Sequence, residues 1–232
     1  MILIDPDTRQ KAISNIVNLI NEKNYDGVNI DFEFIPTWTR DSYTSFIKGL
    51  SRELKQYNKI LVVSVFPKID VPINLQGAYD YSAITPHVDR IVMMTYDHHW
   101  STGPSGPVAP INWVESNIKY ALEYISSDKL LLGIANYGYN WGQNQIGEDI
   151  STKKALNLAA EKGTEILWNN EYKVPYFNYY DVDGLKHEVW FENSYSLEHK
   201  LALVTKYNLK GIAIWRLGNE TERFWKIINK NL

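Results

Sequence analysis

Five short apolar segments recur along the chain, and amphipathic helical patterns separate them. The segments are rich in Val, Ile, Leu and aromatic residues, as buried parallel strands are. The five predicted strands are GVNIDFEF (27–34), ILVVSVF (60–66), RIVMMTYD (90–97), LLLGIANYG (130–138) and GIAIWRLG (211–218). The predicted helices cover residues 7–23, capped by Asp5 or Asp7, and residues 40–57, 111–125 and 221–232. Strands that alternate with helices predict an α/β fold with a parallel sheet.

The gap between the fourth and fifth apolar segments is much longer than the others. It contains a predicted helix at 152–162, short strands at 165–169, 173–181 and 184–192, and a second helix at 196–208. The tripeptide VDG at 182–184 is typical of a hairpin turn. We therefore expect residues 142–195 to form a small insertion with its own antiparallel strands.

The first predicted strand has apolar and polar faces, because strand side chains alternate with period two. Its apolar residues are Val28, Ile30, Phe32 and Phe34, and its polar residues are Asn29, Asp31 and Glu33. In a parallel barrel the polar row would point inward and rise toward the carboxyl end of the strand, where barrel active sites lie. The alternation alone fits a half-exposed strand equally well. The other four segments are almost continuously apolar, which favours a sheet covered on both faces. We then expect burial to raise the pKa of Glu33 and keep it protonated beside an ionised Asp31.

Composition narrows the possible functions. The 232 residues carry a net charge of −3, so no basic face is indicated and a nucleic-acid partner is not expected. The absence of cysteine excludes disulfides and thiolate metal sites. The start, MILIDPDTRQ, has neither the basic nor the apolar region of a signal peptide, and no apolar run is long enough to span a membrane. The 16 Tyr and 8 Trp suit stacking on sugars as well as core packing.

The segment DGVNIDFE (26–33) resembles the D-x-x-D-x-D-x-E signature of glycoside hydrolase family 18, the chitinase-like (β/α)8 barrels. Asp26, Asp31 and Glu33 match the signature, and Asn29 departs from it. The segments MTYD (94–97), GIANYGYNW (133–141) and GIAIWRLG (211–218) resemble the sixth, seventh and eighth strands of that family.

Within the family, the chain resembles the spore-germination and cortex-lytic N-acetylglucosaminidase branch. Two further segments carry this likeness, YDHHWSTGPSGPVAPINWV (96–114) and PYFNYYDVDGLKHEVWFE (175–192). That branch often has Asn at the position of Asn29, so the departure favours the branch. His98 stands at a position where the resemblance implies an acidic residue. We expect this difference to alter the contacts with substrate.

The resemblance implies that the acidic motif lies on the fourth strand of the barrel. Residues 1–232 would then form one catalytic domain running from the third helix and fourth strand to the eighth helix, with the small α+β insertion between strands seven and eight. Five βα units cannot close an eight-stranded barrel. We therefore expect either a fragment or a natural truncation, with open sheet edges that favour self-association.

The resemblance also implies roles for individual residues. Glu33 would be the acid and base, Asp31 would hold the acetamide group of the substrate, and Tyr96 would hydrogen-bond its carbonyl. Asp26 and Asn29 would support Asp31. The remaining residues would bind substrate, namely Asp97, Met94, Trp215, Tyr137 and Trp141.

Each of these residues also fits a structural role. Trp215 in an apolar strand suits core packing, and Tyr96 and Asp97 could end a strand and cap a loop. The neighbouring His98 and His99 would point to opposite sides of a strand, so no metal is expected. No cofactor is expected either.

Three functions remain open at this stage. The first is hydrolysis of β-1,4-linked N-acetylglucosamine glycans, with peptidoglycan of the spore cortex as substrate. The second is a chitinase or chitobiase. The third is a non-catalytic, lectin-like glycan-binding module, which the presence of Glu33 disfavours. The branch resemblance implies a location in the spore, at the cell envelope or outside the cell.

Overall fold

A computed structural model describes residues 2–232 of the protein. One sheet contains β1 (Gly27–Ile30), β2 (Ile60–Val65), β3 (Arg90–Met93), β4 (Leu130–Ala135) and β10 (Gly211–Trp215), in the order β1-β2-β3-β4-β10. β1 pairs with β2 in parallel, and β2 pairs with β3 in parallel. The predicted α/β fold with a parallel sheet is confirmed.

A second sheet is antiparallel and has the order β6-β5-β9-β8-β7. Its strands are β5 (Tyr137–Gly142), β6 (Glu148–Ser151), β7 (Leu167–Asn169), β8 (Val174–Tyr180) and β9 (Lys186–Phe191). The turn between β8 and β9 contains Gly184 at φ 76°, and the Asp181 carboxylate accepts hydrogen bonds from the backbone N–H groups of Asp183 and Leu185. The pair β5 and β6 was not predicted.

The longer helices are α1 (Pro6–Glu22), α2 (Arg40–Lys55), α5 (Ile111–Ala121), α6 (Thr152–Lys162), α7 (Ser194–Lys206) and α8 (Glu222–Asn231). Short turns of helix complete the chain, namely η1 (Thr37–Thr39), α3 (Ile73–Gln76), α4 (Tyr81–Ile84) and η2 (Thr85–His87). Asp5 caps α1 by accepting from the Thr8 N–H, and Asn193 and Ser196 form a capping box on α7. The helices predicted from the sequence begin and end within a few residues of their predicted limits.

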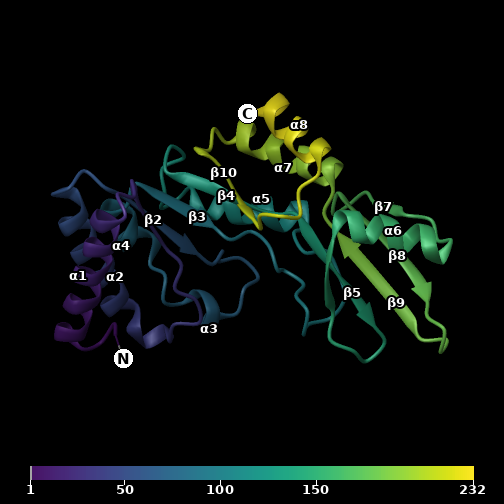
Figure 1. The fold of residues 1–232 in the computed structure, drawn as a ribbon, viewed down its shortest axis with the longest axis horizontal. Helices are drawn as coiled ribbons and strands as arrows, with labels where there is room; N and C mark the ends of the chain where they lie inside the picture. The colour runs from purple at the N-terminus through teal and green to yellow at the C-terminus, as the bar shows by residue number, and fades with distance from the viewer. Residues whose placement is uncertain (1) are drawn as a thin grey trace. The chain divides into compact units, whose positions relative to one another are not determined.

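The chain divides into two compact units. The first unit comprises the residues up to Met94 together with Lys119–Leu131, and the second comprises Thr95–Ile118 and Leu132–Leu232. In the first unit α1 and α2 lie side by side (Figure 1), and α2 buries Phe46, Ile47 and Leu50. In the second unit α6 covers the antiparallel sheet, with Ala155 and Ala159 in one apolar cluster with Phe177 and Phe191.

The structure corrects the prediction for the first strand. β1 ends at Ile30 rather than at Phe34, and the chain turns at Phe34, whose φ is 53°. Ile30 is buried and Phe32 stacks on Phe46 of α2, as the alternation predicts. Phe34, however, is 71% exposed, because the turn takes it off the apolar face.

The expectation that both faces of the sheet are covered also fails at the ends of the sheet. β2, β3 and β4 are largely buried, whereas β10 is only partly covered and its last residue, Trp215, is 50% exposed. β1 and β10 are the first and last strands in the sheet order. An end strand has a neighbour on one side only, so its side chains lose part of their cover.

Candidate functional site

The two predicted supporting residues of the acidic motif, Asp26 and Asn29, are both exposed. The carbonyl of Asp26, just before β1, accepts a hydrogen bond from the Ile60 N–H at 2.9 Å, which starts the pairing with β2. The amide nitrogen of Asn29 donates to the Ser64 hydroxyl at 2.9 Å. This contact holds Asn29 against the neighbouring strand.

Asp31 and Glu33 lie in the extended segment that follows β1, and both are exposed. This corrects the prediction that the two carboxylates are buried, and removes burial as a reason for a raised pKa of Glu33. Burial raises the pKa of the Tyr79 phenol, and the charges of Glu33 and then Asp31 raise it further. Tyr79 was not among the predicted site residues, and no periodic pattern marks it.

Met94 and Tyr96 follow β3. Met94 is buried, and its N–H donates to the Val65 carbonyl at 3.0 Å, which continues the pairing of β3 with β2. Tyr96, in the second unit, is partly buried and packs against a small apolar cluster that contains Val108, Ala135 and Tyr137.

Asp97 is anchored by two tyrosines of β5. Its Oδ1 accepts hydrogen bonds from the hydroxyls of Tyr137 at 2.7 Å and Tyr139 at 3.1 Å. Both tyrosines point from one face of β5, as residues two apart in a strand do. The structure therefore brings together Asp97 and Tyr137, which the sequence proposed separately, and adds Tyr139, which the same alternation could have revealed.

The electrostatics of this cluster follow from burial. Burial raises the pKa of Asp97, the two tyrosine hydrogen bonds oppose that rise, and the charge of Asp149 adds to it. Burial beside Asp97 in turn raises the pKa of Tyr137 and Tyr139. The phenols are therefore neutral donors at ordinary pH, and the carboxylate is the acceptor.

Trp141 extends the same face of β5. Its ring centroid lies 5.3 Å from that of Tyr139, and the side chain is only 5% exposed. A Cβ at Gly147 would lie 2.6 Å from the indole nitrogen, so only glycine leaves room for this ring. Within residues 2–232 the indole N–H has no hydrogen-bond partner.

Trp215 is the last residue of β10. Its backbone is held by Asn136, which was not among the predicted site residues. The buried Asn136 donates through its side chain to the Arg216 carbonyl at 2.7 Å and accepts from the Arg216 N–H at 2.8 Å. The Asn136 N–H also donates to the Trp215 carbonyl at 3.2 Å. The Trp215–Arg216 peptide bond held by these contacts is cis.

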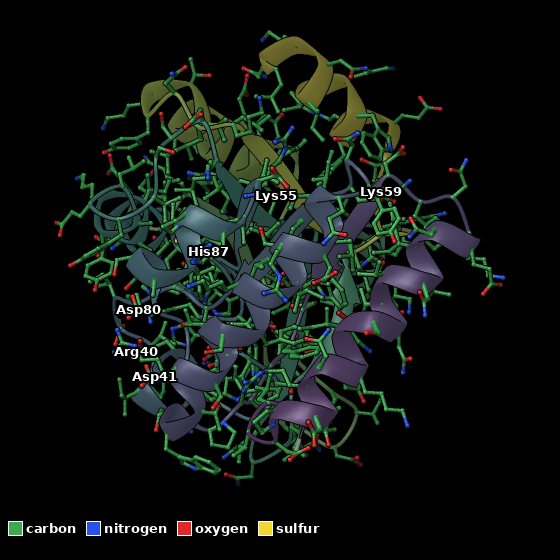
Figure 2. All side chains as sticks on the ribbon, turned by 90° about the vertical axis from the view of Figure 1, so that its left-hand side faces the viewer. Arg40, Asp41, Lys55, Lys59, Asp80 and His87 are labelled. Atoms are coloured by element: carbon green, nitrogen blue, oxygen red, sulfur yellow. The ribbon has the colours of Figure 1, made fainter. Side chains whose placement is uncertain are left out.

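A cavity of about 560 Å³ in the first unit lies between α1 and α2, and none of the predicted site residues lines it. Its lining is basic, with Arg9, Lys48, Arg52 and Lys55 beside His87. Figure 2 labels Lys55 and His87 on this part of the first unit. Burial, followed by the charges of Lys48 and Lys55, lowers the pKa of His87.

Residues 2–232 lack two features. They contain no group of three or more His, Cys, Asp or Glu side chains placed to hold a metal ion. None of their helices combines the length and the apolar character that a membrane crossing requires.

Comparisons with known proteins agree with this architecture. The family model for glycosyl hydrolases family 18 matches residues 2–220. The cortical fragment-lytic enzyme of Bacillus cereus is 30% identical over 100% of this chain and 55% of its own length. The chain thus spans about half the length of this relative.

Two crystal structures have a similar fold. The spore cortex-lytic enzyme SleL of Bacillus megaterium QM B1551 gives a TM-score of 0.92 at 31% identity, covering 100% of this chain and 55% of that one. The chitinase of Chromobacterium violaceum ATCC 12472 gives a TM-score of 0.93 at 31% identity, covering 97% and 72%. With the family model matched over nearly the whole chain, the parallel α/β sheet and the acidic motif at β1 have one explanation: the chain belongs to glycosyl hydrolase family 18.

Proposed function

We propose that this chain hydrolyses β-1,4-linked N-acetylglucosamine glycans by a substrate-assisted retaining mechanism, with Glu33 as the acid and base. The observation that carries the proposal is the exposed pair Asp31 and Glu33. The two residues are separated only by Phe32 and lie in the segment that follows the carboxyl end of β1. Parallel α/β barrels use this end of their strands for chemistry. A solvent-accessible carboxyl group there is within reach of a polymeric substrate.

In the first step, the acetamide oxygen of the substrate attacks the anomeric carbon. The bond to the leaving oxygen breaks, and Glu33 gives that oxygen its proton. Asp31 accepts a hydrogen bond from the acetamide N–H and stabilises the positive oxazolinium ion. In the second step Glu33, now a carboxylate, takes a proton from water as the water attacks the anomeric carbon and reopens the ring. The second displacement restores the original configuration.

The family motifs imply further residues that would bind substrate. Tyr96 would donate to the acetamide carbonyl, and Trp215 offers a half-exposed indole on which a sugar can stack. Asp97, held by Tyr137 and Tyr139, would accept hydrogen bonds from sugar hydroxyls. Asp26 and Asn29 would support Asp31, while Met94 and Trp141, both buried, would each support bound substrate within their own unit.

We propose peptidoglycan of the spore cortex as the substrate, which implies a location in the spore. The support is the likeness to the cortical fragment-lytic enzyme of Bacillus cereus and to SleL. Chitin oligomers are the second candidate, because the Chromobacterium chitinase has an equally similar fold.

The test is a mass-spectrometric digest of cortex muropeptides and of chitin oligomers by the wild-type chain and by Glu33→Gln. Both proteins are first shown to melt cooperatively. General acid–base catalysis contributes about 10²–10⁴-fold, so the variant should lose at least that much turnover. Product masses identify the substrate and the bond that is cleaved.

Two outcomes would contradict the proposal. Equal product formation by the wild type and Glu33→Gln would remove Glu33 from the mechanism. No product from either folded protein, together with retention on a glycan column, would favour the lectin-like alternative.

A further inference from the structure

The segment that carries Asp31 and Glu33 is not held by strand pairing. The register of β1 with β2 ends at Ile30 opposite Val63, and the chain turns at Phe34. An acid catalyst must nevertheless be held close to one geometry, because small misplacements lower the rate strongly. Some other contact must therefore fix the backbone between the two carboxylates.

Tyr79 makes such a contact. Its hydroxyl donates a hydrogen bond to the carbonyl of Phe32, the residue between Asp31 and Glu33. Tyr79 is only 1% exposed and follows the short helix α3. A single buried phenol thus holds the peptide group that links the two predicted catalytic positions.

Aromatic packing fixes the rings on both sides of this hydrogen bond. The Tyr79 ring meets that of Tyr43 edge-on at 5.5 Å and lies 5.9 Å from that of Phe66. The Phe32 ring stacks on Phe46 at 5.4 Å. Because both partners belong to one packed cluster, the hydroxyl and the carbonyl have little freedom to separate.

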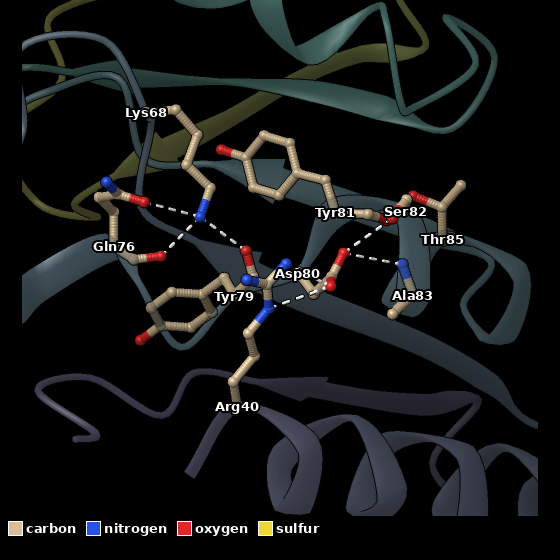
Figure 3. A network of polar contacts seen from close by, with 9 residues as sticks. All are labelled: Arg40, Lys68, Gln76, Tyr79, Asp80, Tyr81, Ser82, Ala83 and Thr85. Atoms are coloured by element: carbon tan, nitrogen blue, oxygen red, sulfur yellow. Dashed lines mark hydrogen bonds and ion pairs between the residues drawn. The ribbon is translucent and has the colours of Figure 1, made fainter. Parts of the chain in front are cut away.

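Polar contacts fix the main chain of Tyr79 as well (Figure 3). The Lys68 ammonium donates to the carbonyls of Tyr79 and Gln76, each at 2.6 Å, and to the Gln76 side chain at 2.8 Å. The next residue, Asp80, caps α4 and pairs with Arg40 of α2. The tyrosine is therefore anchored at its backbone, its ring and its hydroxyl.

We propose that Tyr79 is a positioning residue for Asp31 and Glu33, acting through the hydrogen bond from its hydroxyl to the Phe32 carbonyl. This role rests on the proposed function, in which Glu33 is the acid. Tyr79 itself does not touch substrate. It sets the direction in which the two carboxylates leave the backbone.

The test compares Tyr79→Phe with Tyr43→Phe. Both variants remove one hydroxyl from a buried ring of the same cluster, but the Tyr43 hydroxyl has no hydrogen-bond partner within residues 2–232. We expect Tyr79→Phe to lower kcat by about tenfold to a hundredfold with KM nearly unchanged. Tyr43→Phe should keep kcat within about twofold, since a buried hydroxyl without a partner contributes no bond that could be lost.

A second readout does not depend on turnover. The dipeptide Phe-Glu occurs at 32–33 and again at 191–192, so carbonyl-labelled Phe with nitrogen-labelled Glu selects the amides of Glu33 and Glu192. In Tyr79→Phe the Glu33 amide signal should shift and exchange its hydrogen faster, while the Glu192 signal stays in place. In Tyr43→Phe neither signal should move appreciably.

The outcomes separate this inference from the proposed function. If Glu33→Gln is inactive but Tyr79→Phe keeps full kcat and an unmoved Glu33 signal, the positioning role is overturned and the hydrolase stands. If the wild type makes no product but only the Glu33 signal moves in Tyr79→Phe, the backbone contact stands and the proposed function fails.

Discussion

In the first unit Asp31 and Glu33, the acids of the predicted site, are exposed. In the second unit Asp97 is partly buried and Glu192 is buried, and both accept hydrogen bonds. Asp97 receives two tyrosine hydroxyls. Glu192, after β9, forms an ion pair with Lys200 of α7 at 2.7 Å, with side chains only 3% and 1% exposed. The same chemical group thus has three different environments in one chain.

The difference shows how the molecule separates stability from reactivity. A buried carboxylate must be paired or hydrogen-bonded, because desolvation disfavours its charge. An exposed carboxylate keeps more of its hydration and is accessible to a substrate. The cost of exposure is positional freedom, which Tyr79 limits from the buried side by holding the backbone at Phe32. Replacing a carboxyl group with an amide at each site tests this comparison.

The largest effect is expected at Glu192. In Glu192→Gln the Lys200 ammonium stays buried without a counter-charge, so the free energy of unfolding should fall by about 3–5 kcal/mol. Urea denaturation gives this difference directly. Glu188→Gln on β9 is the control, because its pair with Lys186 is partly exposed and such pairs contribute about 0–1 kcal/mol. Equal losses in the two variants would show that burial does not set the cost.

For Asp97→Asn we expect an intermediate effect on the free energy of unfolding, of opposite sign to that of Glu192→Gln. Its pKa is raised by burial, so the folded state binds more protons than the unfolded state just above the usual carboxyl range. The wild type should therefore lose stability as the pH rises from the unfolded pKa through the folded one. Asp97→Asn can still accept from both tyrosines, and it removes this loss.

Thermal melts of the wild type and Asp97→Asn across that pH range measure the difference, because only the wild type can titrate at position 97. We expect the variant to be the more stable protein near neutral pH and to bind glycan less well. A variant that is less stable at neutral pH would mean that Tyr137 and Tyr139 more than offset the desolvation of the charge.

The smallest effect on stability is expected at Asp31. Because this side chain is exposed, Asp31→Asn should change the free energy of unfolding by no more than about 0.5 kcal/mol. Under the proposed function its turnover should nevertheless fall, since the amide cannot stabilise the oxazolinium charge. A loss of stability similar to that of Glu192→Gln would assign Asp31 a structural role and erase the contrast between the two units.

Local signals in the sequence determined much of the architecture. Apolar runs and helical periodicity predicted the parallel strands and the main helices, and Asp5 was a foreseeable cap because it precedes Pro6 and accepts from the Thr8 N–H. The alternation also agrees with the exposure along this segment, because Asn29, Asp31 and Glu33 are exposed while Ile30 is buried and Phe32 is partly buried. Strand and helix periods are fixed by backbone geometry, so they can be read without knowing the fold.

Tertiary structure decided what those residues meet. The early end of β1 at Ile30, the pairing of β5 with β6 and the exposure of Phe34 and Trp215 depend on which strands find neighbours. The contacts of Tyr79 with Phe32, Tyr137 with Asp97 and Asn136 with Arg216 join residues 40 or more positions apart. The sequence alone therefore determined which side chains are available for chemistry. Only folding determined which are buried, which are paired and which remain exposed, because burial and long-range hydrogen bonds depend on segments distant in the chain.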